Sequence, residues 1–117
     1  MIFLNINLYN DDNPNLILNA LTLFDTGASI SVITKNKANA LNLNTIGNRT
    51  VTGLGGSNIY EYVNISVIYN KKQINIGAII YDEIRIGNTF CDFIIGNDIY
   101  KNSKFDYDNG IFNFEIT

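Results

Sequence analysis

Apolar residues recur at every second position over much of the chain, and this is the period of a β-strand. Residues 2–9 place isoleucine or leucine at each even position, and residues 59–69 place apolar side chains at most odd positions. Two runs rich in apolar residues, at 16–24 and 73–81, predict further strands. Residues 93–95 form a short, wholly apolar run that predicts another. The pattern therefore predicts a mostly β fold.

Short polar segments between these runs predict tight turns. The segment DDNPN at residues 11–15 contains Pro14, whose fixed φ and missing N–H suit a turn, so the apolar runs on either side are expected to pair as a hairpin. Residues 70–72, NKK, predict the turn into the next strand. Asn109-Gly110 favours the positive φ values of a tight hairpin turn within residues 105–116.

Helix signals are confined to two short stretches. Thr34 is a suitable N-cap for a helix over residues 35–41, in which Ala38 and Leu41 lie three positions apart and can face a core. A second helical turn is expected over residues 97–101. The chain is therefore expected to be all-β and mainly antiparallel, with one short helix.

The composition describes a chain that can bury its own core. Of 117 residues, 46% are hydrophobic and 16% are charged, which excludes a disordered tail. A domain of this size buries roughly two-thirds of its unfolded surface, and no linker or repeat interrupts it, so residues 1–117 are expected to form one domain. No apolar run approaches the roughly 18–20 residues that cross a bilayer, so no membrane partner is expected.

Several kinds of chemistry are excluded by residue types that are missing. The chain has no histidine and one cysteine, so the sequence offers no histidine-dependent nucleophile, internal disulfide or zinc site. The cysteine, Cys91, is expected to be a small core residue. The eight basic residues are scattered and the net charge is −3, so a nucleic-acid partner is not expected.

Two weak features bear on location. The N-terminal sequence MIFLNINLYNDD has neither the basic segment nor the cleavage pattern of a signal peptide. The chain also lacks a cysteine pair that could form a disulfide in an oxidising compartment. Together these features favour a reducing, cytoplasmic location.

Asp25 stands out among the eleven carboxylates of the chain. It directly follows an apolar run that ends at Phe24, and Thr26 and Gly27 come next. A charged residue after a buried strand, with a glycine two positions later, indicates a tight loop that directs a carboxylate at a cavity. The simpler interpretation is an aspartate that ends a strand and caps a turn, and the local pattern alone leaves both open.

The segment FDTGAS at residues 24–29 resembles the active-site loop of aspartic proteases. TVTGLGGSNIY at 50–60 resembles their glycine-rich flap hairpin, and CDFIIGNDIY at 91–100 resembles the segment that passes behind the catalytic loop in retropepsins. FNFEI at 112–116 lies where the family has its last strand. The resemblance therefore implies a retropepsin-like acid protease barrel over essentially the whole chain.

This resemblance implies an aspartic endopeptidase that hydrolyses peptide bonds in an extended polypeptide. In such enzymes two carboxylates share one proton, one acting as base toward water and the other as acid toward the carbonyl oxygen. The chain contains the DTG motif once, so the resemblance implies a symmetric homodimer in which Asp25 of each subunit is catalytic. No metal or organic cofactor is implied.

The resemblance implies a role for each residue of the loop after Asp25. Thr26 matches the threonine that braces the two loops against each other at the dimer axis. Gly27 matches the glycine whose carbonyl accepts a substrate N–H. Ala28 and Ser29 continue the substrate-binding floor of the loop.

The flap and a pocket wall supply the other expected contacts with substrate. The flap tip is expected at Gly53, Leu54, Gly55 and Gly56, and a plain surface hairpin is the alternative interpretation. Ile94 matches a substrate-pocket wall, and simple core packing is the alternative for that residue. An apolar pocket at this position would favour apolar side chains beside the scissile bond.

Two positions depart from the viral members of the family. Viral enzymes often pair an acidic residue with an arginine where this chain has Ser29 and Asn97. Both partners are absent together, so no lone buried charge is left, and Asp98 resembles the cellular and bacterial members more closely. The departure leaves open whether the two chain ends interleave into one sheet or the dimer rests on other strands.

A second function, of a different class, fits the same fold. A retropepsin-fold dimerisation or peptide-binding module with weak catalysis would use the same groove and the same two-fold interface. The intact Asp25-Thr26-Gly27 favours the protease, because a binding module has no need of two paired carboxylates. Cleavage of peptides, as opposed to binding without cleavage, separates the two hypotheses.

Overall fold

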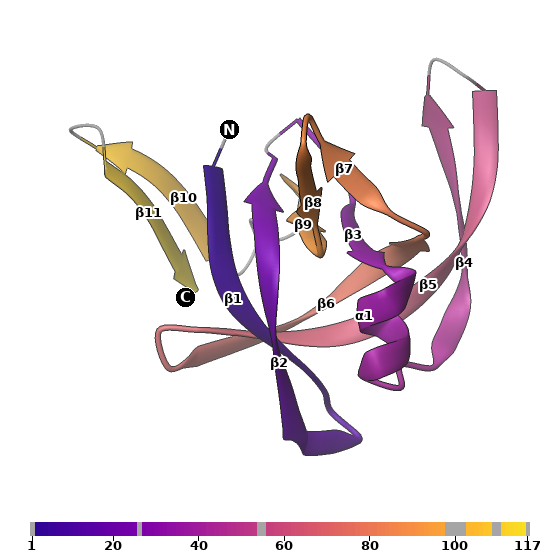
Figure 1. Ribbon diagram of the computed structural model, residues 1–117, viewed down its shortest axis with the longest axis horizontal. Helices are drawn as coiled ribbons and strands as arrows, with labels where there is room; N and C mark the ends of the chain where they lie inside the picture. Colours follow the sequence, from indigo (N-terminus) through magenta and orange to yellow (C-terminus); the bar gives the residue numbers. More distant parts are fainter. Residues whose placement is uncertain (1, 26, 54–55, 98–102, 109–110, 117) are drawn as a thin grey trace.

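The computed structural model describes residues 2–25, 27–53, 56–97, 103–108 and 111–116 (Figure 1). These residues form strands and one short helix, in the order β1 (Ile2–Asn10), β2 (Asn13–Phe24), β3 (Ser31–Thr34), α1 (Lys35–Ala40), β4 (Thr45–Gly53), β5 (Gly56–Tyr69), β6 (Lys72–Tyr81), β7 (Ile84–Ile86), β8 (Thr89–Cys91), β9 (Phe93–Ile95), β10 (Ser103–Asp108) and β11 (Ile111–Ile116). The predicted class, all-β with one short helix, is confirmed.

The main sheet closes on itself. Its strand order is β1-β2-β9-β3-β6-β5-β4, and β1 also pairs with β5 through Asn7, Leu8 and Tyr9. Most neighbours are antiparallel, whereas β2 with β9 and β3 with β6 are parallel. The closure satisfies backbone groups that an open sheet would leave unpaired, and it makes the fold a small barrel from which the β4–β5 hairpin extends (Figure 1).

The first hairpin forms as predicted, but its turn lies elsewhere. Strands β1 and β2 pair from Ile2↔Phe24 onward, and the turn consists of Asp11 and Asp12. The prediction of a turn at Pro14 is wrong, because Pro14 is already the second residue of β2. The turn is closed by the Asp12 N–H, which donates to Asn10 Oδ1 at 3.0 Å. The register shifts after Tyr9, so the missing N–H of Pro14 costs no ladder bond.

The turn predicted at residues 70–72 is confirmed between β5 and β6. Asn70 and Lys71 have φ values of 55° and 66°, and they join the paired residues Tyr69 and Lys72. Positive φ at both central positions matches the right-handed twist of the flanking strands. The turn thereby sets the register of the β5–β6 hairpin.

The predicted helix and its cap are also confirmed. The Thr34 hydroxyl accepts the Lys37 N–H at 3.4 Å, and α1 runs from Lys35 to Ala40. Ala38 and Leu41 are buried against the barrel, as their spacing predicted. Of the second predicted helical turn, residues 97–101, all but Asn97 lie outside the described residues.

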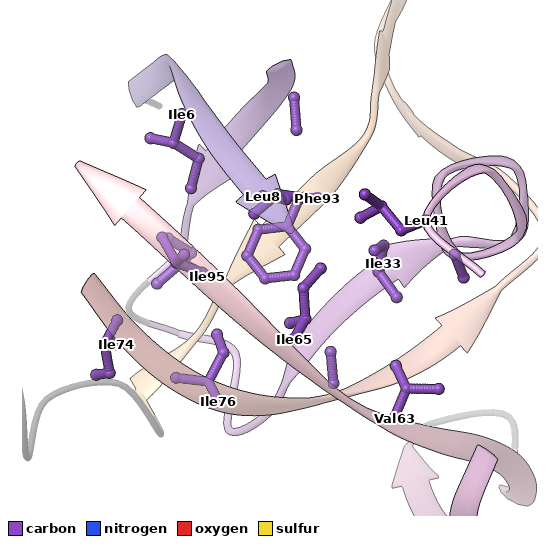
Figure 2. Close-up of a cluster of buried hydrophobic side chains, with 14 of the residues drawn as sticks. Ile6, Leu8, Ile33, Leu41, Val63, Ile65, Ile74, Ile76, Phe93 and Ile95 are labelled. Atoms are coloured by element: carbon purple, nitrogen blue, oxygen red, sulfur yellow. The ribbon is translucent and has the colours of Figure 1, made fainter. Parts of the chain in front are cut away.

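Phe93 lies at the centre of the main hydrophobic cluster (Figure 2). Its side chain is fully buried, and Leu8 of β1, Ile65 of β5 and Ile95 of β9 surround it (Figure 2). The other members come from the even positions of β1, the odd positions of β5, the strands that face them, and helix α1 with its C-cap: Ile6, Ala20, Phe24, Ile33, Ala38, Leu41, Val63, Val67, Ile74, Ile76 and Ala78. The alternating pattern therefore packs as it predicts, with one face of each long strand in the core.

A smaller cluster contains Cys91. It packs with Leu23 and Ile84, and partly buried Phe3 and Ile94 lie against it. Burial raises the pKa of the Cys91 thiol, and backbone hydrogen bonds to the sulfur oppose that rise. Cys91 is thus a buried residue of the core, as expected.

The last hairpin pairs β10 with β11, from Ser103↔Ile116 to Asp108↔Ile111. Its predicted turn residues, Asn109 and Gly110, lie outside the described residues. No helix in the described part of the chain is long and apolar enough to cross a membrane.

Replacing Phe93 with alanine is expected to lower the free energy of unfolding by about 3–5 kcal/mol, because the ring leaves a cavity that the surrounding strands cannot fill. Denaturant unfolding followed by circular dichroism measures the loss. The matched control is Ile59→Ala, whose side chain is 71% exposed, and it is expected to change stability by less than about 0.5 kcal/mol. Equal losses in the two variants would contradict the described core.

Candidate active site

Asp25 is the first residue after β2, and backbone hydrogen bonds hold it in place. Its N–H donates to the carbonyl of Ile95 at 3.0 Å, and its own carbonyl accepts the Ala28 N–H at 3.1 Å. The Asp25 side chain is half-buried, and its Oδ1 accepts the Gly27 N–H at 3.0 Å. The carboxylate is therefore oriented by the loop that follows it.

Gly27 keeps the space beside this carboxylate open. A Cβ at position 27 would lie 3.2 Å from Asp25 Oδ1, which is tighter than an ordinary contact. A larger residue would push on the oxygen that the Gly27 N–H holds. The missing side chain of Gly27 thus leaves Asp25 Oδ1 in its place, which is a separate advantage from the backbone flexibility of glycine.

Strand β9 and the two residues after it support the Asp25 loop. The strand lies between β2 and β3, parallel to the first and antiparallel to the second, so the Asp25 loop must cross over its end. The Gly96 N–H donates to Ser31 Oγ at 3.2 Å, and the Asn97 N–H donates to the Ala28 carbonyl at 2.8 Å. These bonds attach the middle of the loop and the start of β3 to the chain that follows β9.

Gly96 makes this crossing possible. A Cβ at this position would lie 2.8 Å from the carbonyl oxygen of Ala28 and 2.9 Å from the carbonyl group of Ile30. All of these are backbone atoms, so no side chain can move aside to make room. The glycine of the IIG segment is therefore required by the close approach of two backbones.

Asp92 ties three strands together, and sequence analysis did not single it out. Its Oδ2 accepts the Leu21 N–H at 2.9 Å, its N–H donates to the Leu21 carbonyl at 2.9 Å, and its carbonyl accepts the Thr34 N–H at 3.0 Å. The feature that could have identified Asp92 in the sequence is its place directly before the apolar run of β9. Asp25 likewise lies next to an apolar strand, directly after β2.

An apolar cavity of about 320 Å³ is lined by residues of β3, β4, β5, β6, β7 and β9. Its walls include Val32 of β3, Ile79 of β6 and Ile94 of β9, and the rings of Tyr60 and Tyr81 lie 5.7 Å apart at its side. Ile94 also packs against the cluster that contains Cys91. The two interpretations of Ile94 are thus compatible, since one side chain both packs in the core and lines a cavity.

A second cavity, of about 350 Å³, lies between the loop and the β4–β5 hairpin. Ser29 and Ile30 line it from the loop, and Thr50, Thr52 and Tyr62 line it from the hairpin. Val51 lines both cavities, so the two adjoin. Together they form a groove that starts at the Asp25 loop and runs along β4.

Of the predicted site residues, Ser29 and Ile94 line the groove. The loop contains Asp25, Gly27, Ala28 and Ser29. Ile94 lies one residue before Ile95, the end of β9, whose carbonyl accepts the Asp25 N–H. At the far end of the hairpin, Gly53 pairs with Gly56, which has a φ of 105°. Thr26, Leu54 and Gly55 lie outside the described residues.

The described residues contain no cluster of three or more histidine, cysteine, aspartate or glutamate side chains that could hold a metal ion. Among the residues that line the two cavities, the acidic one is Glu83, and Asp25 lies in the loop that leads to Ser29. What the arrangement offers chemically is one oriented carboxylate beside a groove with apolar and polar sections.

Comparison with known proteins identifies the family. The sequence profile of the aspartyl protease family matches residues 18–99, which is well over half of the chain. The chain is a member of the aspartyl protease family. The match includes Asp25, the β4–β5 hairpin and strand β9, so it spans the elements that form the groove. No curated protein matches the chain.

Solved structures show that the fold of this aspartyl protease family member is retropepsin-like. EIAV protease complexed with the inhibitor HBY-793 has a TM-score of 0.57 and 21% identity, covering 86% of this chain and 85% of that one. A retropepsin-like aspartic protease from Rickettsia conorii has a TM-score of 0.57 and 19% identity, over 94% and 79%. The retroviral protease-like domain of Ddi1 from Leishmania major has a TM-score of 0.57 and 14% identity, over 100% and 95%.

Replacing Gly96 with alanine is expected to destabilise the protein by about 1–3 kcal/mol, because its Cβ would overlap the backbone of the Asp25 loop. Denaturant unfolding measures the change. Gly47→Ala is the control, since a Cβ there meets only the end of the Arg49 side chain, at 3.9 Å. A Gly96→Ala protein as stable as the control would show that the loop is not held against β9 as described.

Proposed function

We propose that the protein is an aspartic endopeptidase that works as a homodimer, with Asp25 of each subunit in the catalytic pair. The observation that carries the proposal is the oriented Asp25 carboxylate, which the Gly27 N–H holds at 3.0 Å in a loop supported by β9. It occurs in a member of the aspartyl protease family, in a loop whose residues Ser29 and Ile30 line the groove. A carboxylate so placed can act on a peptide that lies in the groove.

The proposed reaction needs two carboxylates that share one proton. The ionised carboxylate takes a proton from water, and the water oxygen forms a bond to the peptide carbonyl carbon. The protonated carboxylic acid gives its proton to the carbonyl oxygen, which yields a tetrahedral diol. The C–N bond then breaks and the amine leaves with a proton. Two carboxylates at hydrogen-bond distance cannot both ionise, so their shared proton is a consequence of proximity.

The homodimer follows from the single DTG motif. One subunit supplies one Asp25, so the partner carboxylate has to come from a second copy. A two-fold axis next to the loop would bring the same loop of both subunits together, since an isologous interface joins each patch to its own copy. In this arrangement Thr26 is the proposed brace between the two loops.

An extended peptide fits the proposed groove. Strand β4 is at the end of the sheet order, so its outer edge is available for backbone hydrogen bonds to a bound strand. The apolar cavity at Val32 and Ile94 would take an apolar side chain near the scissile bond. The β4–β5 hairpin is the proposed flap, with Gly53, Leu54 and Gly55 at its tip, and its closure would exclude water.

The first test replaces Asp25 with asparagine. Cleavage is expected to fall by roughly a hundred- to ten-thousand-fold, because the amide can neither accept the proton of water nor share one with its partner. Turnover of an unbiased peptide library, followed by mass spectrometry, measures the loss, and circular dichroism checks that the fold is retained. Cleavage by the variant at the wild-type rate would refute the assignment. Binding of peptides by the wild type without any cleavage would favour the binding module.

The second test concerns the dimer. Activity per mole of protein is expected to fall on dilution below the dimer Kd, because the single Asp25 of a monomer has no partner. Initial rates measured across a dilution series are compared with sedimentation at the same concentrations. Excess Asp25→Asn protein is also expected to inhibit the wild type through mixed dimers. Activity proportional to concentration throughout, with no inhibition by the variant, would argue against shared catalysis.

A further inference from the structure

Arg49 of β4 presents a positive charge that lies against an aromatic ring. The centre of its guanidinium is 4.1 Å from the centroid of the Tyr62 ring, and its Nη1 donates to the Asn48 carbonyl at 3.0 Å. In the described part of the chain no carboxylate pairs with it. Stacking on a ring restrains the guanidinium without using up its ability to bind an anion.

The ring below Arg49 is itself held in one place. Tyr62 lies across the backbone of Gly77 in the neighbouring strand β6, where a Cβ would come within 1.7 Å of the tyrosine Oη. Gly47, opposite Tyr62 on β4, is not needed in the same way, because a Cβ there would meet Arg49 Nη1 at an ordinary contact distance of 3.9 Å. Gly77 alone therefore makes room for the ring on which the Arg49 guanidinium stacks.

This stacked pair borders the groove through Tyr62, the ring on which the Arg49 guanidinium lies. Tyr62 lines the second cavity, here called the outer cavity, together with Ser29 and Ile30 of the Asp25 loop. The outer cavity adjoins the apolar cavity through Val51. A peptide that leaves the catalytic loop along β4 therefore passes the stacked pair.

We propose that Arg49 is a specificity-determining residue that binds an aspartate or glutamate side chain of the substrate. This inference rests on the proposed function, and it names the substrate class as peptides with an acidic residue outside the pair that flanks the scissile bond. A guanidinium can bind a carboxylate through two parallel hydrogen bonds, and neutral side chains of similar size cannot reproduce them. In a two-fold dimer each end of the groove carries one Arg49, so an acidic residue is recognised on either side of the cleavage point.

The other arginine near the groove does not fit this role. Arg85, at the rim of the apolar cavity, donates from Nε to the carbonyl of Gly87 at 3.0 Å and lies 5.5 Å from the Phe90 ring. It is thus bound to its own β7–β8 turn. Glu83 at the same rim would repel an acidic side chain. The preference for an acid is therefore expected at the outer cavity alone.

The test compares peptides that differ only by glutamate or glutamine, with this residue moved through every position of one cleaved sequence. Wild-type protein is expected to prefer glutamate about fivefold in kcat/KM at one position on each side, which is typical of a partly exposed charged pair. In Arg49→Gln the ratio is expected to fall to about one. Lys35→Gln, which removes the same charge from the exposed start of α1, is the matched control and is expected to keep the ratio.

Binding separates this inference from the proposed function. The same peptides are titrated into Asp25→Asn protein, where the glutamate peptide is expected to bind about fivefold more tightly and to lose that advantage at high salt. Tighter binding of the glutamate peptide, without cleavage of any peptide by the wild type, would support the role of Arg49 and refute the protease function. Equal binding and equal cleavage of both peptides, or a glutamate preference that survives in Arg49→Gln, would overturn the role of Arg49. Protein that neither binds nor cleaves any of the peptides would overturn both.

Discussion

The candidate site depends on the close approach of two backbones, where the end of β9 passes beneath the Asp25 loop. Gly96 lies within contact of the carbonyl groups of Ala28 and Ile30, and hydrogen bonds on both sides of this crossing attach the loop to β9. Because the contact is between main chains, it leaves almost no freedom in where the loop lies. The orientation of the Asp25 carboxylate follows from this crossing and from the Gly27 N–H.

The same short strand connects the site to the core. Phe93, at its start, fills the centre of the hydrophobic cluster, and Ile95, at its end, accepts the backbone N–H of Asp25. Asp92, just before it, bonds to β2 and to the residue that caps α1. The free energy that stabilises the core therefore also fixes the loop. A protein built this way holds the Asp25 loop in place through core packing and backbone hydrogen bonds.

The groove beside the loop has two parts with different chemistry. The inner part is apolar, and burial of a side chain against Val32 and Ile94 would favour size and shape more than charge. The outer part contains hydroxyl groups and the Tyr62 ring, with Arg49 stacked upon it. A retropepsin-like fold of this kind can therefore combine a general preference for apolar residues near the bond with a specific preference farther away.

Local patterns in the sequence were sufficient for the hairpins, the capped helix and the position of Asp25 after a buried strand, because strand period, turn residues and caps act over a few neighbouring positions. The family resemblance of FDTGAS added the loop's expected chemistry. Only the tertiary structure decided that β9 inserts between β2 and β3, that Pro14 lies in a strand, and that Gly77 accommodates Tyr62. Those features depend on contacts between residues far apart in the chain, and no local pattern encodes which distant backbones meet.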